Sequence, residues 1–94
     1  MRDIAEGGPH VTLYHAVDCS LCARAIEVVR SVRGELDFDL ALVDIAGSSE
    51  LEARYRELVP AVEIDGELVF TYFVDEGALR KRLRPVPPAA PTEA

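Results

Sequence analysis

The chain has 94 residues, 49% of them hydrophobic, and a formal net charge of −7 at pH 7. This length allows a single domain with a modest core. The acidic balance argues against nucleic-acid binding, because neutralising phosphates requires a clustered basic face. The only two cysteines, Cys19 and Cys22, are too few and too close together for a secreted scaffold held by disulfides.

The two ends of the chain lack the apolar periodicity of its middle. Residues 1–9 contain early acidic residues and no apolar run, and residues 85–94 are rich in proline. We expect a flexible N-terminal arm (1–9), one folded domain (10–84) and a disordered tail (85–94). Without a signal peptide or a membrane-spanning stretch, we expect a cytoplasmic protein, where a close cysteine pair is more often catalytic or metal-binding than structural.

The first half of the domain predicts a strand, a helix and a second strand. Val11–His15 is a short run of β-prone residues. Ser20–Arg33 has an apolar face at helical spacing and is followed by Gly34, which predicts an amphipathic helix. Leu36–Leu42 alternates apolar and polar residues, which predicts the second strand.

The second half predicts a short helix, a hairpin and a last helix. Ser49 and Glu52 have the spacing of a capping box, and the following helix ends before Pro60. Ala61–Ile64 and Leu68–Tyr72 flank an Asp-Gly pair, which is a strong hairpin signal. An N-cap aspartate at position 75 begins the last helix. The order is β-α-β-α-β-β-α, and helices should cover both faces of one four-stranded mixed sheet.

The pair Cys19-Ser20-Leu21-Cys22 carries the chemical signal. Cys19 should lie at the start of a helix, where free N–H groups and the helix dipole favour a thiolate and lower the thiol pKa below about 8.5. Cys22 lies almost one turn later on the apolar face and should be less exposed. We therefore expect Cys19 to attack a substrate disulfide and Cys22 to resolve the mixed disulfide.

Other interpretations of the pair remain open. A zinc site would need two more ligands, and the only histidines, His10 and His15, lack ligand spacing. The pair could also be vestigial and buried as small hydrophobic residues, or serve a redox sensor. The neighbouring carboxylate of Asp18 opposes thiolate formation unless it is a solvated cap.

Three segments resemble the glutaredoxin-like branch of the thioredoxin superfamily: Leu13-Tyr14 with the cysteine pair, Val43-Asp44-Ile45, and Val59 to Gly66. The resemblance covers Val11 to Leu83 and implies an α/β, thioredoxin-like fold. It also implies that Pro60 is cis and faces the cysteines, and that the Val59 backbone pairs with the substrate chain.

The sequence departs from glutathione-binding glutaredoxins in three places. Ser20-Leu21 replaces Pro-Tyr, Val17-Asp18 lacks their basic residue, and Thr71 to Val74 stands where they have a Gly-Gly pair. Asp75 either matches their acidic residue or is simply an N-cap. The resemblance therefore leaves glutathione binding undecided.

Taken together, the sequence predicts a monomeric thiol–disulfide oxidoreductase that reduces protein or small-molecule disulfides. The alternative is a non-catalytic thioredoxin-fold binding, metal or redox-sensing protein. We expect no metal and no bound cofactor, with glutathione as a co-substrate or, alternatively, a thioredoxin-type reductase as the electron donor. Besides the catalytic Cys19 and Cys22, the residues expected to bind substrate are Tyr14, Val59, Pro60 and Asp75.

Overall fold

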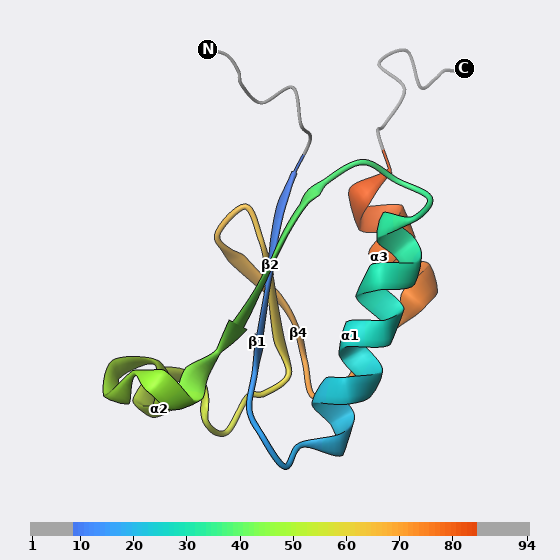
Figure 1. Ribbon diagram of the computed structural model, residues 1–94. Coiled ribbons are helices and arrows are strands. Elements are labelled where there is room, and N and C mark those ends of the chain that lie inside the picture. Colours follow the sequence, from blue (N-terminus) through green and yellow to red (C-terminus); the bar gives the residue numbers. More distant parts are fainter. Residues whose placement is uncertain (1–8, 85–94) are drawn as a thin grey trace, which may run out of the picture.

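A four-stranded mixed sheet with three α-helices forms the structure, a computed structural model that describes residues 9–84 (Figure 1). In chain order the elements are β1 (His10–His15), α1 (Ser20–Arg33), β2 (Asp39–Asp44), the 3-10 turn η2 (Ile45–Gly47), α2 (Ser49–Tyr55), β3 (Ala61–Ile64), β4 (Glu67–Thr71) and α3 (Glu76–Leu83). The predicted order β-α-β-α-β-β-α is confirmed. Apart from Pro9, the expected N-terminal arm (1–9) and C-terminal tail (85–94) lie outside the described residues.

The strands are arranged β2-β1-β3-β4. β1 pairs in parallel with β2, with Leu13 opposite Leu42, and pairs antiparallel with β3. Tyr14 lies opposite Ala61, so the end of β1 lies beside the start of β3. The chain leaves β1 toward α1 at the same edge of the sheet where it enters β3.

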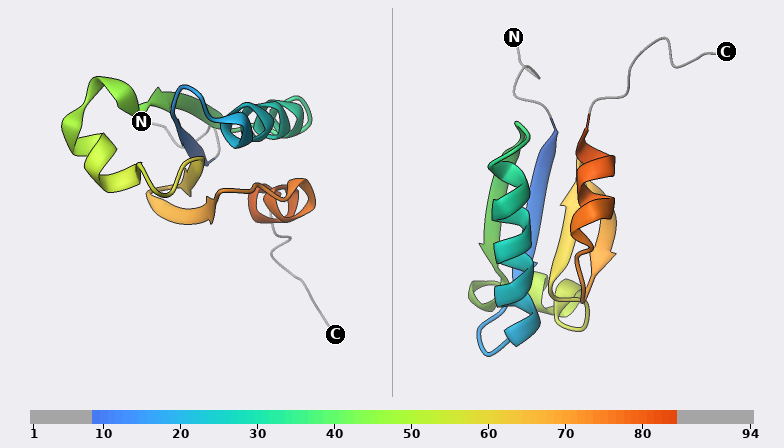
Figure 2. Two further views of the ribbon diagram at one scale, coloured as in Figure 1. Left: turned by 90° about the horizontal axis from the view of Figure 1, so that it is seen from below. Right: turned by 90° about the vertical axis from the view of Figure 1, so that its right-hand side faces the viewer.

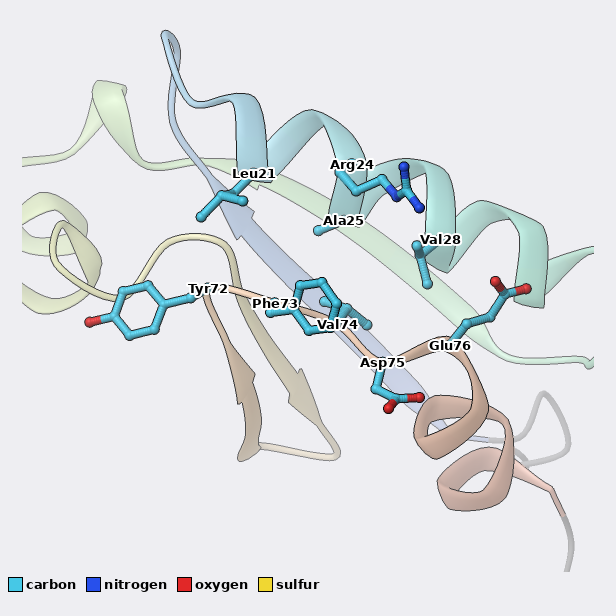
Figure 3. A pocket seen from close by; sticks show the side chains of 9 residues that line it. All are labelled: Leu21, Arg24, Ala25, Val28, Tyr72, Phe73, Val74, Asp75 and Glu76. Carbon is cyan, nitrogen blue, oxygen red and sulfur yellow. The ribbon is translucent and has the colours of Figure 1, made fainter.

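Helices cover both faces of the sheet, as predicted (Figure 2). α1 and α3 pack on one face, and α1 also lies beside the segment that links β4 to α3 (Figure 3). The buried residues of this larger core come from β1, α1, β3, α3 and the loops before β2 and α3: Val11, Leu13, Ala25, Val29, Val32, Phe38, Val62, Ile64, Val74, Leu79 and Leu83. On the other face, below α2, the buried cluster consists of Ile45, Tyr55 and Ala61.

The predicted second strand was wrong at both ends, and the first strand begins one residue earlier than predicted, at His10. The second strand covers Asp39–Asp44 rather than Leu36–Leu42, because Leu36 and Phe38 pack against the core from a loop. The Phe38 carbonyl accepts a hydrogen bond from Arg33 Nε at 2.9 Å instead of joining the sheet. Apolar residues two apart in an inward-facing loop imitate the pattern of a strand.

The cap of α2 was also placed one residue late. Ser48 is the N-cap: its backbone is extended, and its Oγ accepts a hydrogen bond from the Leu51 N–H at 3.2 Å. Ser49 already belongs to the helix, so the predicted capping box with Glu52 is absent. The Asp75 cap, by contrast, is confirmed, since its Oδ1 accepts from the Ala78 N–H at 3.0 Å.

The last strand ends one residue earlier than predicted. β4 stops at Thr71, and Tyr72 has a φ of +66°, a left-handed conformation that cannot continue a strand. Within residues 9–84, no helix combines the length and the apolar character needed to cross a membrane.

Candidate functional site

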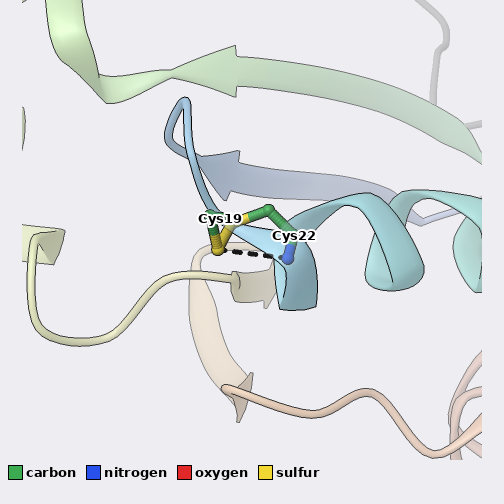
Figure 4. The surroundings of a disulfide bond; sticks show 2 residues. All are labelled: Cys19 and Cys22. Atoms are coloured by element: carbon green, nitrogen blue, oxygen red, sulfur yellow. Dashed lines mark hydrogen bonds between the residues drawn. A yellow bond between two sulfur atoms is a disulfide. The ribbon is translucent and has the colours of Figure 1, made fainter.

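The cysteine pair lies at the N-terminus of α1. Cys19 is the N-cap residue with an extended backbone, and Cys22 lies in the first turn. The two are joined in a disulfide, with their Cα atoms 5.2 Å apart (Figure 4). The Cys22 N–H donates both to Cys19 Sγ and to the Cys19 carbonyl at 3.1 Å, so an N–H of the first turn already points at this sulfur.

The two cysteines differ in exposure. Cys22 is 2% exposed and belongs to the face of α1 that packs on the sheet, together with Ala25 and Val29. Cys19 is only partly buried. A disulfide approaching from solvent therefore meets Cys19 first, with Cys22 behind it.

The loop from β1 to α1 turns sharply just before the pair. Asp18 has a φ of +57°, a conformation that aspartate tolerates better than most residues, and both Asp18 and Val17 are exposed. This turn brings Cys19 to the start of the helix directly beyond the end of β1.

The proline loop lies at the same edge of the sheet. The Val59–Pro60 peptide bond is cis, as the resemblance implied; Pro60 is buried and Val59 partly buried. The Pro60 carbonyl accepts a hydrogen bond from the Tyr72 N–H at 2.8 Å. The structure thus brings the segment before β3 to the end of β4, next to the loop that carries the cysteines (Figure 1).

Tyr14 packs away from the groove described below. Its ring stacks on Tyr55 with centroids 4.0 Å apart, within the cluster under α2. The Tyr55 hydroxyl donates to Glu63 Oε2 at 2.5 Å. Burial, together with this hydrogen bond, raises the pKa of Tyr55 above its ordinary value.

A groove of about 470 Å³ opens between α1 and the segment that follows β4 (Figure 3). Its walls are mainly apolar, and the lining residues are Leu21, Arg24, Ala25, Val28, Tyr72, Phe73, Val74, Asp75 and Glu76. Asp75 both caps α3 and lines the groove; its role in binding substrate stays a prediction.

Of the residues that line this groove, sequence reasoning expected only Asp75 at the site, and Phe73 and Leu21 are among those it missed. Phe73 is 68% exposed, and Leu21, between the cysteines, is also exposed. A signal for Leu21 was its apolar side chain at the flank of the buried stripe of α1, where it is exposed and lies one turn before Ala25. Phe73 had no such signal, because its exposure depends on where β4 ends.

Charged groups surround the groove without forming a metal site. Arg24 lies on the α1 wall, and Glu76 accepts a hydrogen bond from Arg80 at 2.6 Å. Across residues 9–84, no group of three or more histidine, cysteine, aspartate and glutamate side chains is placed to hold a metal ion.

The β2-β1-β3-β4 sheet, with a cysteine pair capping α1 and a proline loop beside it, defines a protein of thioredoxin-like fold. Residues 10–84 match the family model of the glutaredoxin-like domain (DUF836). The chain belongs to this glutaredoxin-like domain family, as the resemblance predicted.

Relatives and solved structures agree with this assignment. An uncharacterised protein of Mycobacterium tuberculosis is 31% identical over 77 residues, which cover 77% of this chain and 79% of the relative. An X-ray structure from X. campestris is 29% identical, with a TM-score of 0.65, over 82% of this chain and 99% of that one. Two more distant structures share the fold at 24% identity and a TM-score of 0.69: a Nitrosomonas europaea protein (88% of this chain, 99% of that one) and a mutant thioredoxin from Halobacterium salinarum (88% and 81%).

Proposed function

We propose that the protein is a thiol–disulfide oxidoreductase in which Cys19 is the nucleophile and Cys22 the resolving thiol. The observation that carries the proposal is the asymmetry of the pair. Cys19 caps α1, accepts an N–H from its first turn and is partly exposed, whereas Cys22 is buried behind it. A helix N-terminus stabilises a thiolate, which is the reactive form of cysteine.

The reaction has two exchange steps and begins with the reduced pair. The Cys19 thiolate attacks one sulfur of a substrate disulfide, and the other substrate sulfur leaves as a thiolate that takes up a proton from water. The Cys22 thiolate then attacks the Cys19 sulfur and releases the second substrate thiol. The substrate has gained two electrons, and the Cys19–Cys22 disulfide seen in the structure is the oxidised product.

A second thiol source must then reduce the Cys19–Cys22 disulfide. We propose glutathione or a thioredoxin-type reductase as this electron donor, in the reducing cytoplasm and with the protein acting as a monomer. The chemistry requires no metal and no bound organic cofactor, because both electrons move between sulfur atoms.

We place the substrate along the proline loop and the groove. Val59 lies at the edge of the site, and its backbone N–H and carbonyl pair with an extended substrate chain. This is the binding mode in which a peptide adds a strand through main-chain hydrogen bonds. Leu21 and Phe73 offer exposed apolar surface to the side chains beside the substrate disulfide.

The test is the rate at which each cysteine of the reduced protein is alkylated across pH, resolved by peptide mass spectrometry. We expect Cys19 to react faster, with a midpoint well below that of a free thiol, and Cys22 to stay protected. In parallel, Cys19→Ser should abolish the protein's acceleration of insulin reduction by dithiothreitol, while Cys22→Ser should accumulate a mixed disulfide. If both cysteines titrate like free thiols, the binding or metal-ligand alternative takes the place of this proposal.

A further inference from the structure

Tyr72 has a backbone conformation that its residue type disfavours. Among residues 9–84, three non-glycine residues have a positive φ: Asp18, Asp65 and Tyr72. Aspartate visits this region routinely, but a bulky aromatic residue seldom does. Tyr72 is also 48% exposed, so core packing does not explain why its side chain is held there.

Two hydrogen bonds tie Tyr72 to the loop before β3. Its N–H donates to the Pro60 carbonyl at 2.8 Å, and its hydroxyl donates to the Glu57 carbonyl. The two acceptors stand on either side of Leu58 and Val59. We call this pair of hydrogen bonds the Tyr72 strap; it joins the end of β4 to both ends of the segment that contains Val59.

The strapped segment has a free backbone. Within the described residues, neither the N–H nor the carbonyl of Val59 takes part in a backbone hydrogen bond. A free N–H and carbonyl held at the margin of a sheet are what an added strand requires. Holding this segment in place before substrate arrives lowers the ordering cost of binding.

We propose that Tyr72 is a positioning residue that holds Val59 ready to pair with the extended chain of a protein disulfide. This inference rests on the proposed function and deepens it, because it names polypeptide disulfides as the substrates that depend on the strap. A small disulfide that reaches only Cys19 makes no use of the Val59 backbone and is indifferent to the strap.

Tyr72→Phe tests the proposal, since it keeps the ring and removes only the hydroxyl that bonds Glu57. Reduction is measured with insulin as the protein disulfide and with 5,5′-dithiobis(2-nitrobenzoic acid) as the small one. We expect the KM for insulin to rise about 2- to 10-fold, the span one neutral hydrogen bond can account for. The kcat for insulin stays unchanged, because pairing of the substrate with the Val59 backbone stabilises the bound state and the transition state equally. The rate with the small disulfide also stays unchanged, because this substrate does not use the Val59 backbone.

Leu68→Ala is the matched control. Leu68 is an exposed apolar residue of β4 that pairs with Glu63 near the hairpin, away from the proline loop. It should change neither substrate's kinetics. An unchanged insulin KM in Tyr72→Phe, or equal losses with both substrates, overturns the role of Tyr72 while leaving the oxidoreductase proposal intact.

A measurement without turnover separates the two proposals. Backbone 15N relaxation reports the order of the Val59 amide in the wild-type protein and in both variants. The order parameter should fall in Tyr72→Phe and remain as in wild type in Leu68→Ala. Wild-type protein that reduces neither disulfide refutes the proposed function, whereas an unchanged Val59 order parameter refutes the strap by itself.

Discussion

At the scale of single residues, Cys19 experiences two opposing electrostatic influences. The N–H groups of the first turn of α1 favour its thiolate, and one of them already points at its sulfur. The carboxylate of the preceding residue, Asp18, disfavours it. Asn tolerates the left-handed backbone of Asp18 as well as aspartate does, so the charge can be removed without disturbing the turn.

Asp18→Asn should therefore make Cys19 more reactive at neutral pH. We expect the pH midpoint of Cys19 alkylation to fall by about half a pH unit or less, the size of an interaction between exposed charges. Asp65→Asn is the matched control, because Asp65 also has a left-handed backbone but lies in the β3–β4 turn. A midpoint that stays constant in Asp18→Asn would show that the carboxylate is screened by solvent.

Tyr55 makes a polar contact in the layer under α2. It is 4% exposed and donates to Glu63, and its raised pKa keeps the hydroxyl protonated. Because the folded pKa lies above the unfolded one, this stabilisation is complete below about pH 10 and is lost only as alkali titrates the folded hydroxyl.

Tyr55→Phe should thus reduce the free energy of unfolding by about 1–2 kcal/mol at pH 7, measured by urea denaturation. The loss should be the same at pH 6 and pH 8, since the hydroxyl does not titrate between them. Glu63→Gln, which keeps an acceptor oxygen, should cost less. A Tyr55→Phe protein as stable as wild type would mean that the hydrogen bond contributes nothing net.

At the scale of elements, the groove lies between α1 and the segment that follows β4. Phe73→Ser should raise the KM for insulin about 3- to 10-fold, because exposed aromatic surface is lost from the substrate's path. Its effect on stability should be small, since the ring is largely solvent-exposed. Leu68→Ser, an equally drastic change at a remote exposed position, should leave KM unaltered; equal KM effects in both variants would place the substrate elsewhere.

A second link between elements is the ion pair of Arg80 with Glu35. Arg80 in α3 donates two hydrogen bonds of 2.7 Å to Glu35, which follows α1, and the hydrogen bond from Arg80 lowers the Glu35 pKa. With the folded pKa below the unfolded one, the stabilisation is present above about pH 4.5 and is lost as acid protonates the folded carboxylate.

Glu35→Gln should therefore lower Tm by about a degree or two at pH 7, as expected for an exposed pair. The difference from wild type should vanish once acid has protonated the folded carboxylate, and it should shrink in 1 M NaCl. Calorimetry across pH and salt measures both trends. A difference that persists unchanged in acid would mean that charge is not its origin.

The elements predicted well are those whose local signals agree. α1 has the predicted bounds because its apolar face continues for four turns and a glycine follows its end. The strand near Leu36 was misplaced because period-two alternation also occurs in an inward-facing loop. The cysteine pair and the proline loop were visible as motifs, since each lies within a short stretch of sequence.

The groove and the strap could not be predicted in the same way. Leu21 and Phe73 become neighbours only through the packing of α1 beside the β4–α3 segment, and no local pattern reports that contact. Tyr72 has high strand propensity, which conceals its left-handed backbone and its bonds to the proline loop. Both features depend on contacts between residues far apart in the chain.

At the scale of the whole molecule, the two faces of the sheet are unequally stabilised. The core under α1 and α3 contains eleven buried residues, whereas the cluster under α2 contains three. α2 has only seven residues and cannot be stable by itself, so its order depends on that small cluster. Regions with few buried contacts open at lower free energy than the core.

Hydrogen exchange should therefore occur in α2 before α1. We expect amides in 49–55 to exchange well before those in 22–32 under native conditions, and mass spectrometry measures this exchange. Exchange of both helices at one common rate would instead mean that α2 opens only when the whole domain unfolds, together with the larger core.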